Sequence, residues 1–265
     1  MYTRDDLSFV ICAYGESPYL EECISSLKGQ STPVRIAVAT STPNEHIRSL
    51  ADRFGLPVYV NEGESGIAGD WTYALSVADT PLVTIIHQDD LYLEDYASSV
   101  IEAASKAKDP IIIFTDYAEK RGDAEVKTNK LLKIKRFLLW PLKIKGFHGS
   151  RWVRRRVLSM GNPICCPSVT YVKARLPEKL FDSSYKVSLD WNAWEILSRQ
   201  KGSFVYIPKI RMLHRIHENS ETTHQIENSG RTTEDLRMFR KFWPGFIAGL
   251  IEHFYRSSET SNKMV

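Results

Sequence analysis

The sequence predicts an α/β protein, with a mainly parallel sheet flanked by helices and a helical C-terminal portion. Three observations support this prediction. Short apolar runs rich in β-branched residues recur over residues 8–115, segments with helical spacing separate them, and the connecting loops are short. Such alternation gives right-handed βαβ crossovers, which align strands in parallel and cover both faces of the sheet. The chain of 265 residues is long enough for a sizeable core, and its 43% hydrophobic content excludes a disordered protein.

Five strands and four helices are expected in the first part of the chain. The strands are apolar runs that each end at a polar loop, and they span residues 8–13, 34–39, 58–60, 82–86 and 111–115. The helices are segments in which apolar residues recur every three or four positions, and they span about 19–27, 43–54, 66–78 and 93–107.

The second part of the chain has a different pattern. Residues 126–162 are basic and rich in aromatic residues, and no strand is expected there. Strands are expected over 164–172 and 204–207, the second stopped by Pro208 because proline lacks the N–H that a strand donates. Helices are expected over 187–199 and 232–255, the latter interrupted near Pro244.

Charge is distributed unevenly along the chain. The net charge is only +3, yet residues 126–177 contain thirteen basic residues and no acidic one. The remainder then has 35 − 13 = 22 basic and 32 acidic residues, a net charge of −10. A segment that mixes cations with aromatic residues suits peripheral contact with an anionic membrane. The alternative is a flap that packs on its own body or on a second subunit, which would make the protein a homo-oligomer. Nucleic acid is not expected as a partner, because the body is acidic and no recognised binding module is present.

Several function classes lack their sequence signatures. There is no GxGxxG after the first strand, no GxxxxGK[ST] and no GxSxG, which argues against dinucleotide-binding enzymes, P-loop NTPases and serine hydrolases. The four cysteines form no CxxC pair, so neither a zinc site nor a disulfide framework is expected. No apolar run reaches membrane-span length, and no signal-peptide layout is present. We therefore expect a cytoplasmic protein, one able to act at the inner face of the membrane.

Polar residues follow the first four predicted strands. They are Tyr14 and Glu16, then Thr40 and Ser41, then Asn61 to Gly66, and finally His87 to Asp90. Ligands bind beyond the carboxyl ends of parallel strands, so we expect these residues to converge on one site. Asp89 and Asp90 can hold a divalent cation, which would in turn bind phosphate oxygens. The alternative is an ordinary strand-to-helix turn with Asp90 as the helix N-cap.

Four motifs occur in a characteristic order within about residues 7–120. They are Val10-Ile-Cys-Ala-Tyr-Gly15, the helix ending Cys23–Gln30, the segment Asn61–Leu75 and the strand ending in His87-Gln-Asp-Asp90. Three further motifs lie at residues 163–168, 189–191 and 214–217. In this order the motifs resemble the family 2 glycosyltransferases of the GT-A fold. Each motif is weak alone, and the order and spacing give the resemblance its weight.

The resemblance implies an inverting hexosyl transfer from a nucleotide diphosphate sugar, with UDP or dTDP as the default donor type. It also implies a divalent cation, Mn²⁺ or Mg²⁺, and a glycan or lipid-linked acceptor in bacterial surface polysaccharide synthesis. On this basis we divide the chain into a nucleotide-sugar-binding half (1–120), an acceptor-side half with the basic insert (121–228) and a C-terminal helical extension (229–265).

Individual roles follow from the resemblance. Asp89 matches the last residue of the Asp-x-Asp motif as metal ligand, with Asp90 and His217 as further ligands. Asp190 matches the catalytic base. The expected donor-binding residues are Ala13, Tyr14, Glu16, Thr40, Ser41, Asn61, Gly66, His87 and Arg215. His87 stands where the family has the first aspartate of its motif.

Two points stay open at this stage. Trp191 and Trp194 either line an acceptor site or pack in the core. A sugar-phosphate nucleotidyltransferase and a membrane-associated scaffold with a decayed motif are the alternative functions.

Overall fold

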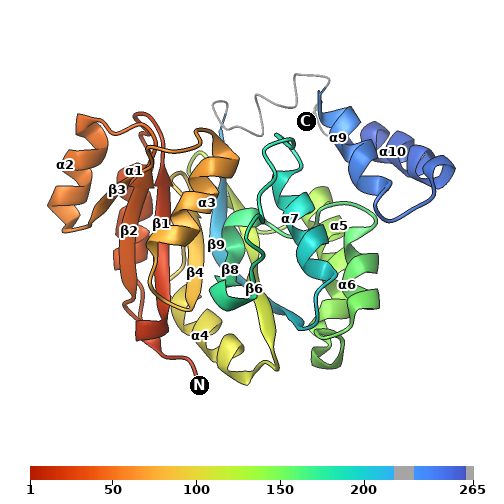
Figure 1. Cartoon of the computed structure of the whole chain (residues 1–265), viewed down its shortest axis with the longest axis horizontal. Helices are drawn as coiled ribbons and strands as arrows, with labels where there is room; N and C mark the ends of the chain where they lie inside the picture. Colours follow the sequence, from red (N-terminus) through yellow and green to blue (C-terminus); the bar gives the residue numbers. More distant parts are fainter. Residues whose placement is uncertain (218–229, 261–265) are drawn as a thin grey trace.

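A computed structural model describes residues 1–217 and 230–260 of the chain (Figure 1). Its centre is one sheet with the strand order β3-β2-β1-β4-β8-β6-β9-β5, and β7 pairs with β6. The strands are β1 Leu7–Ala13, β2 Arg35–Thr40, β3 Val58–Val60, β4 Leu82–His87, β5 Leu91–Tyr92, β6 Pro110–Arg121, β7 Ala124–Val126, β8 Val169–Val172 and β9 Ser203–Ile216. The helices are α1 Leu20–Lys28, α2 Glu45–Phe54, α3 Ile67–Val77, α4 Tyr96–Lys106, α5 Lys130–Leu139, α6 Arg151–Leu158, α7 Leu189–Ser198, α9 Gly230–Phe239 and α10 Gly245–Thr260.

Strand directions make the sheet mixed. Strands β1 to β4 run parallel, and β6 and β9 are parallel to each other. Strand β8 lies between β4 and β6 and is antiparallel to both, so β4 and β6 point the same way. The predicted α/β class is confirmed, with β8 as a reversed strand in the middle of the sheet. The carboxyl ends of β1, β2, β4, β6 and β9 therefore lie along one edge of the sheet.

Side-chain alternation along the strands builds a core on each face of the sheet. In β1, Val10 belongs to one apolar cluster, while Phe9 and Ile11 belong to the other. In β6 the neighbours Ile112 and Ile113 divide in the same way. This period of two is what a strand covered on both faces requires. Helices α3, α6, α7 and α9 contribute to the first cluster, and α1, α2 and α4 to the second.

Three strand predictions need correction. Pro208 does not stop β9, because the pairing with β6 steps from Ile207 to Ile210 and leaves the proline in an irregularity of the ladder. Strand β6 continues to Arg121, well past the predicted end at residue 115. Residues Cys166–Ser168 form a 3-10 turn, η4, so only the end of the predicted strand 164–172 is extended.

The basic segment folds as helices on the right of Figure 1, and of these α6 packs against α7. Asn129 caps α5, since its side chain accepts the N–H of Leu132 at 2.8 Å. After α5 come two 3-10 turns, η2 Trp140–Lys143 and η3 Lys145–Phe147, and then α6. This segment continues directly from the sheet, so the proposed boundary near residue 120 separates two halves of one sheet. The boundary at 228/229 falls outside the described residues.

None of the helices in the described ranges, 1–217 and 230–260, is long and apolar enough to cross a membrane.

Candidate active site

The loop after β4 is joined to the end of β9 by Asp90. This carboxyl is fully buried, and its Oδ1 accepts the backbone N–H of Arg215 at 2.8 Å. The same oxygen lies 2.9 Å from Nδ1 of His214. Helix α4 begins only at Tyr96, so Asp90 is not its N-cap. Asp90 instead fixes two chain segments that are about 125 residues apart.

Asp89 faces the end of β9, where Arg215 and His217 lie. Its Oδ2 lies 3.0 Å from Nε2 of His217, and its backbone carbonyl accepts Nε of Arg215 at 2.8 Å. The Arg215 guanidinium also pairs with Glu22 at 2.5 Å and lies 4.4 Å above the ring of Tyr19. The predicted residues Asp89, Arg215 and His217 are thus brought together, with α1 supplying the support.

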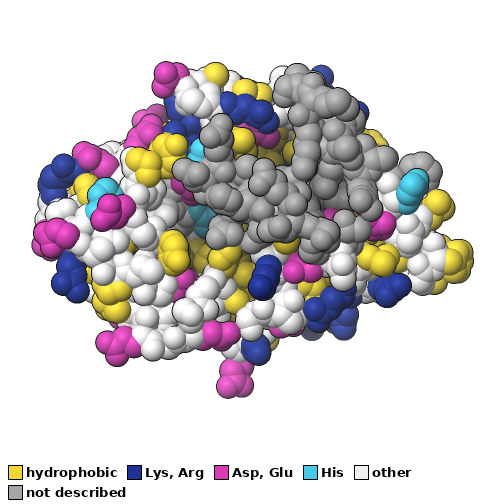
Figure 2. Space-filling view, turned by 90° about the horizontal axis from the view of Figure 1, so that it is seen from above, with side chains coloured by type: hydrophobic (Ala, Val, Ile, Leu, Met, Phe, Trp, Pro, Cys, Tyr) yellow, Lys and Arg dark blue, Asp and Glu magenta, His cyan; other side chains and the backbone are white. Residues whose placement is uncertain are grey.

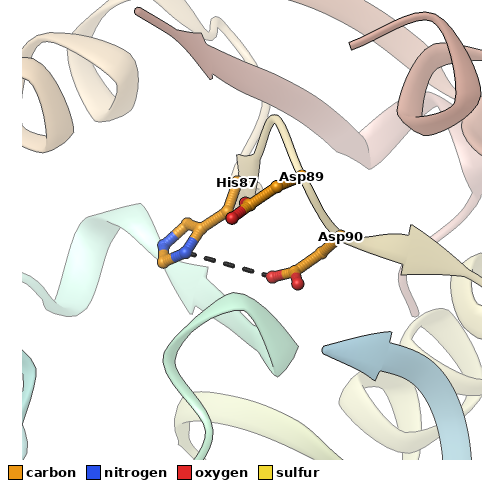
Figure 3. A group of neighbouring side chains, drawn as sticks. All are labelled: His87, Asp89 and Asp90. Carbon is orange, nitrogen blue, oxygen red and sulfur yellow. Dashed lines mark ion pairs between the residues drawn. The ribbon is translucent and has the colours of Figure 1, made fainter. Parts of the chain in front are cut away.

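His87, Asp89 and Asp90 form a possible metal site (Figure 3). One ligand atom of each lies within 4.8 Å of the others, and His87 Nδ1 is 4.0 Å from Asp90 Oδ2. Asp90 Oδ2 and His87 Nε2 are both buried and have no hydrogen-bond partner among the described residues. Buried polar atoms normally have a partner. A set of imidazole and carboxylate donors with such orphan atoms fits a divalent cation.

Trp71 orients the imidazole of His87. The two rings stack with centroids 5.2 Å apart and an interplanar angle of 26°, and Phe181 packs edge-to-face against the same tryptophan. The indole comes from α3, so the helix that follows β3 supports the motif that follows β4.

The charges around this cluster favour the ionised form of Asp89. Burial alone would raise the pKa of this carboxyl, but the nearby His87, the hydrogen bond from His217 and the charge of His214 outweigh it. The net effect is a pKa of Asp89 below its ordinary value. Burial, the largest single influence, lowers the pKa of His214. The charge of Asp90, the hydrogen bond to Asp90 and the charge of Asp89 together outweigh it, so the pKa of His214 lies above its ordinary value. The site therefore favours a carboxylate at Asp89, the form that binds a cation.

The ends of β2 and β3 are linked by Asp70. Ser41 donates to one carboxylate oxygen and Asn61 to the other, each at 3.0 Å. Asp70 lies in the first turn of α3. The preceding loop lies so close to α3 that a Cβ on Gly69 would sit 2.0 Å from the backbone oxygen of Glu64, which explains the glycine at this position.

The end of β1 is held against the motif after β4. The backbone N–H of Tyr14 donates to Gln88 Oε1 and the Tyr14 carbonyl accepts from Gln88 Nε2, both at 3.0 Å. The Tyr14 side chain is exposed, as are Glu16 and Gly66. Ala13 and Thr40 are buried, and Thr40 Oγ1 accepts the N–H of Thr42 within its own turn. These contacts place the predicted donor-binding residues along one edge of the sheet (Figure 2 shows this face from above).

Asp190 lies in the first turn of α7. Its Oδ2 accepts the side-chain N–H of Asn162 and its Oδ1 accepts the backbone N–H of Trp191, both at 2.7 Å. Burial raises the pKa of Asp190 above its ordinary value, against the two hydrogen bonds and the charges of Lys135 and His87. The charge of His87 acts on both Asp89 and Asp190, so the imidazole lies within electrostatic range of both carboxyl groups. Trp191 and Trp194 are buried in the core and do not line this site.

The sequence analysis did not single out four residues around the candidate site. Asp70 looked like an ordinary acidic residue in a first helical turn, and Trp71 like an apolar residue of α3. Lys135 was counted only as part of the basic segment, and Asn162 lies in a stretch without a strand pattern. The resemblance over Asn61–Leu75 could have directed attention to Asp70 and Trp71. The partners of Lys135 and Asn162 are too distant in sequence to be predicted.

Comparison with known proteins agrees with the fold. The fold and the carboxylate motif at its strand ends define a glycosyltransferase. Residues 8–160 match the family model described as glycosyl transferase family 2, which is more than half of the chain. The chain therefore belongs to glycosyl transferase family 2, which confirms the predicted family and enzyme class. No curated protein matches the chain.

Solved structures similar to this chain share its fold at low sequence identity. TarS 1–349 of S. aureus, in complex with UDP-GlcNAc, is 13% identical with a TM-score of 0.63, and the match covers 98% of this chain and 76% of TarS 1–349. The mannosyltransferase PcManGT of Pyrobaculum calidifontis, in complex with GDP-Man and Mn²⁺, is 14% identical with a TM-score of 0.63 and coverage of 95% and 70%. The glucosyl-3-phosphoglycerate synthase of Mycobacterium tuberculosis, with Mn²⁺ and UDP-glucose, is 14% identical with a TM-score of 0.60 and coverage of 90% and 79%.

Proposed function

We propose that this glycosyltransferase moves a sugar, with inversion, from a nucleotide diphosphate sugar to a hydroxyl of a glycan or lipid-linked acceptor. The proposal is supported by two aspartates with pKa values shifted in opposite directions, both within electrostatic range of His87. Asp89 belongs to a cluster suited to a cation, and Asp190 is a half-buried carboxyl with a raised pKa. Sugar transfer of this kind needs charge compensation for the leaving diphosphate and a base for the acceptor hydroxyl.

Asp89 is the proposed principal metal ligand, with Asp90, His217 and the neighbouring His87 completing the set. The unpartnered Asp90 Oδ2 and His87 Nε2 support this assignment. Imidazole donors next to carboxylates favour Mn²⁺ over Mg²⁺. The bound cation would neutralise charge that develops on the diphosphate as it leaves. Arg215 donates a hydrogen bond to the backbone carbonyl of Asp89, and its proposed role is to contact the diphosphate of the donor.

The donor nucleotide is proposed to lie along the ends of β1, β2 and β3. Its contacts would come from the predicted set, Ala13, Tyr14, Glu16, Thr40, Ser41, Asn61 and Gly66. Asp70 joins this set, because each of its oxygens accepts one hydrogen bond and has a further lone pair. An N–H of a uracil or thymine ring is a suitable donor to that carboxylate, which supports a UDP or dTDP sugar.

Asp190 is the proposed general base. Asn162 and the Trp191 N–H fix both of its oxygens, so the remaining lone pairs have a defined direction. In the proposed step the acceptor oxygen bonds to the anomeric carbon while the carbon–oxygen bond to the diphosphate breaks on the opposite side. The acceptor proton passes to the Asp190 carboxylate. Holding acceptor and base in line in this way lowers the entropic part of the barrier.

The acceptor is proposed to be presented at the inner face of a bacterial membrane, in surface polysaccharide synthesis. Support comes from the outer surface of α5, η2 and α6, where Phe137, Trp140 and Trp152 are 78%, 59% and 72% exposed. Exposed lysines, including Lys130 and Lys133, lie on the same segment. Exposed aromatic side chains among cations suit the headgroup layer of an anionic bilayer. A second copy of the chain covering this surface is the alternative.

Thermal unfolding with a panel of nucleotide diphosphate sugars, with and without Mn²⁺, tests the donor proposal. A ligand at a hundredfold excess over its dissociation constant adds about 2.7 kcal/mol of stability. We expect a shift in midpoint with one nucleotide class that needs Mn²⁺ and is absent in Asp89→Ala. A sugar-phosphate nucleotidyltransferase would instead respond to a nucleoside triphosphate and a sugar phosphate, and a decayed scaffold to none of these ligands.

Sedimentation with vesicles tests the membrane proposal. The protein should sediment with vesicles that contain phosphatidylglycerol and remain in solution with phosphatidylcholine alone. Replacing Phe137 and Trp140 by serine should abolish sedimentation without changing donor binding. If the double variant still sediments, another surface of the protein contacts the bilayer.

A further inference from the structure

A cavity of about 780 Å³ lies at the end of the sheet opposite to the candidate active site. Its walls are the end of α4, the turns η2 and η3, and the first residues of β9. Strand β9 starts in the cavity at Ser203 and carries Arg215 in the candidate active site, which is roughly 40 Å further along an extended strand. The cavity therefore shares a strand with the active site but none of its residues.

The cavity has an apolar floor and a cationic rim. The floor is made by Ala103, Ala107, Val205, Ile207 and Pro208. The rim has six lysines, Lys106, Lys108, Lys143, Lys145, Lys201 and Lys209, against two acidic residues, Glu102 and Asp109. Six ammonium groups against two carboxylates leave an excess of four positive charges. These lysines come from three separate parts of the chain, so the excess is produced by the fold and not by one basic run.

Several rim lysines lie close enough to Glu102 to affect its carboxylate. It forms an ion pair with Lys106. The hydrogen bond from Lys106, then its charge, and further the charges of Lys209 and Lys145 lower the pKa of Glu102 below its ordinary value. Lysines from α4, β9 and η3 thus act on a single point of the rim, which is where an anion would be stabilised.

The walls of the cavity are held in place by buried contacts. Arg154 is fully buried and donates to the backbone carbonyls of Ser198, Gln200 and Gly202, which fixes the turn before β9. A Cβ on Gly202 would lie 2.7 Å from the backbone oxygen of Asp109, so only glycine allows this close approach. On the other wall, the backbone N–H of Phe204 donates to the carbonyl of His148 at 3.0 Å. The cavity is therefore formed before any ligand enters.

The apolar side chains beside the rim indicate what kind of anion would arrive there. The turns that contribute Lys143 and Lys145 also expose Trp140, Ile144 and Phe147, which are 59%, 43% and 41% exposed. A soluble anion or an acidic peptide needs lysines but not this row of exposed apolar side chains. A lipid in a membrane suits both features, because its phosphate pairs with the lysines while the exposed apolar side chains enter the bilayer beside it.

We propose that this cavity binds the headgroup of an anionic phospholipid, with the lysine rim on the phosphate and the apolar floor under the glycerol and the adjoining methylene groups. The inference rests in part on the proposed membrane contact, because the exposed residues of η2 and η3 would bring the rim to the bilayer. It goes beyond sugar transfer, since none of the cavity residues belongs to the active site.

Calorimetric titration with dihexanoyl phosphatidylglycerol, below its micelle concentration, tests the proposal without a bilayer. We expect saturable binding, with dihexanoyl phosphatidylcholine and inorganic phosphate each at least tenfold weaker. Lys201→Glu combined with Lys209→Glu should weaken lipid binding at least tenfold, and Ala107→Trp should abolish it by filling the floor. The matched control, Lys28→Glu with Lys179→Glu, changes charge equally at exposed sites outside the cavity and should leave binding unchanged.

Three results would overturn the proposal. They are equal affinity for the two lipids, phosphate binding as tight as lipid binding, and cavity variants that bind like the control pair. If the charge-reversed variant does not fold, Lys201→Gln with Lys209→Gln replaces it, and weaker binding is again expected. Donor-dependent thermal shifts measured on each variant show whether the active site is intact. Replacing Phe137 and Trp140 should abolish vesicle binding but not binding of the short-chain lipid, so failure of the membrane proposal and failure of this one are distinguishable.

Discussion

The end of β4 and the start of α7 each carry one aspartate of the proposed active site, and the surroundings of the two carboxyl groups differ in kind. Around Asp89 three histidines, His87, His214 and His217, outweigh the effect of burial and lower the pKa of the carboxyl. Around Asp190 burial outweighs two hydrogen bonds and raises the pKa. Two carboxyl groups with pKa values moved in opposite directions are suited to different tasks, one to remain charged and the other to take up a proton. The environment of each residue, and not its type, gives it its proposed role.

The largest expected effect comes from removing the proposed base. Asp190→Asn should lower kcat by about 10³-fold, because a positioned general base contributes this order of magnitude. Donor binding should remain, since the substitution does not touch the strand ends. Initial rates and the donor-induced thermal shift measure the two effects.

Asp182→Asn is the matched control for Asp190→Asn, because Asp182 lies in the loop before α7 and its carboxylate accepts the backbone N–H of the nearby Ser184 at 3.0 Å. It should keep normal rates. A near-normal kcat for Asp190→Asn would show that Asp190 is not the general base and that its raised pKa has no role in catalysis.

Asp89→Asn should lower kcat by about 10²-fold or more, since charge compensation by a bound cation is worth several kcal/mol. Unlike Asp190→Asn, it should also abolish the Mn²⁺-dependent part of the donor-induced thermal shift. The amide keeps the size of the side chain, so packing is preserved. If the Mn²⁺ dependence survives, the cation is held elsewhere.

The Asn162 side chain gives a smaller and more specific test. Its hydrogen bond lowers the pKa of Asp190, so Asn162→Ala should raise that pKa further. A base is active above its pKa, and the acid limb of the kcat profile should therefore move to higher pH. At neutral pH we expect roughly a tenfold loss of kcat, from a hydrogen bond to a charged group worth about 1.5–3 kcal/mol.

A full pH profile separates positioning from simple destabilisation for Asn162→Ala. A lower kcat at every pH, with the acid limb where it is in the unaltered enzyme, would show that Asn162 does not act through the ionisation of Asp190. The Michaelis constant for the donor should change little, because Asn162 is not among the strand-end residues.

His87→Asp is expected to have the smallest effect, and it changes preference more than rate. It introduces the aspartate that the family motif has at this position. An all-carboxylate set favours Mg²⁺ more than a set with imidazole does, so the ratio of the Mg²⁺-supported to the Mn²⁺-supported rate should rise severalfold. Rates at saturating concentrations of each metal measure this ratio, and an unchanged ratio would show that His87 is not a ligand.

The sequence predicts the fold well where local pattern decides it. Strands β1 to β4 and helices α1 to α3 follow from apolar periodicity, and the bounds of β3 were predicted to the residue. The direction of β8 could not be predicted, because it depends on which strands it pairs with. The passage of β9 through Pro208 depends on an irregular register with β6, which also has no local signal.

The candidate site likewise has residues that the sequence predicts and residues that depend on contacts between distant segments. Motif order identifies Asp89 and Asp190 as candidates, and the family is confirmed. The role of Asp90 as a structural link depends on Arg215 and His214, far along the chain. Asn162 and the lysine cavity likewise arise from contacts between distant segments. Sequence motifs identify the candidate reactive residues, whereas the contacts that support these residues can be seen only in the three-dimensional structure.

The link made by Asp90 has a consequence for synthesis of the protein. Its partners, the His214 ring and the Arg215 N–H, are made about 125 residues after it. Chains emerge from the ribosome in order, and contacts distant in sequence form late. A nascent chain of 200 residues thus carries both aspartates of the motif but lacks the strand that fixes them. We expect the growing polypeptide to bind no nucleotide sugar until β9 has been synthesised, because the Asp90 contacts form only then.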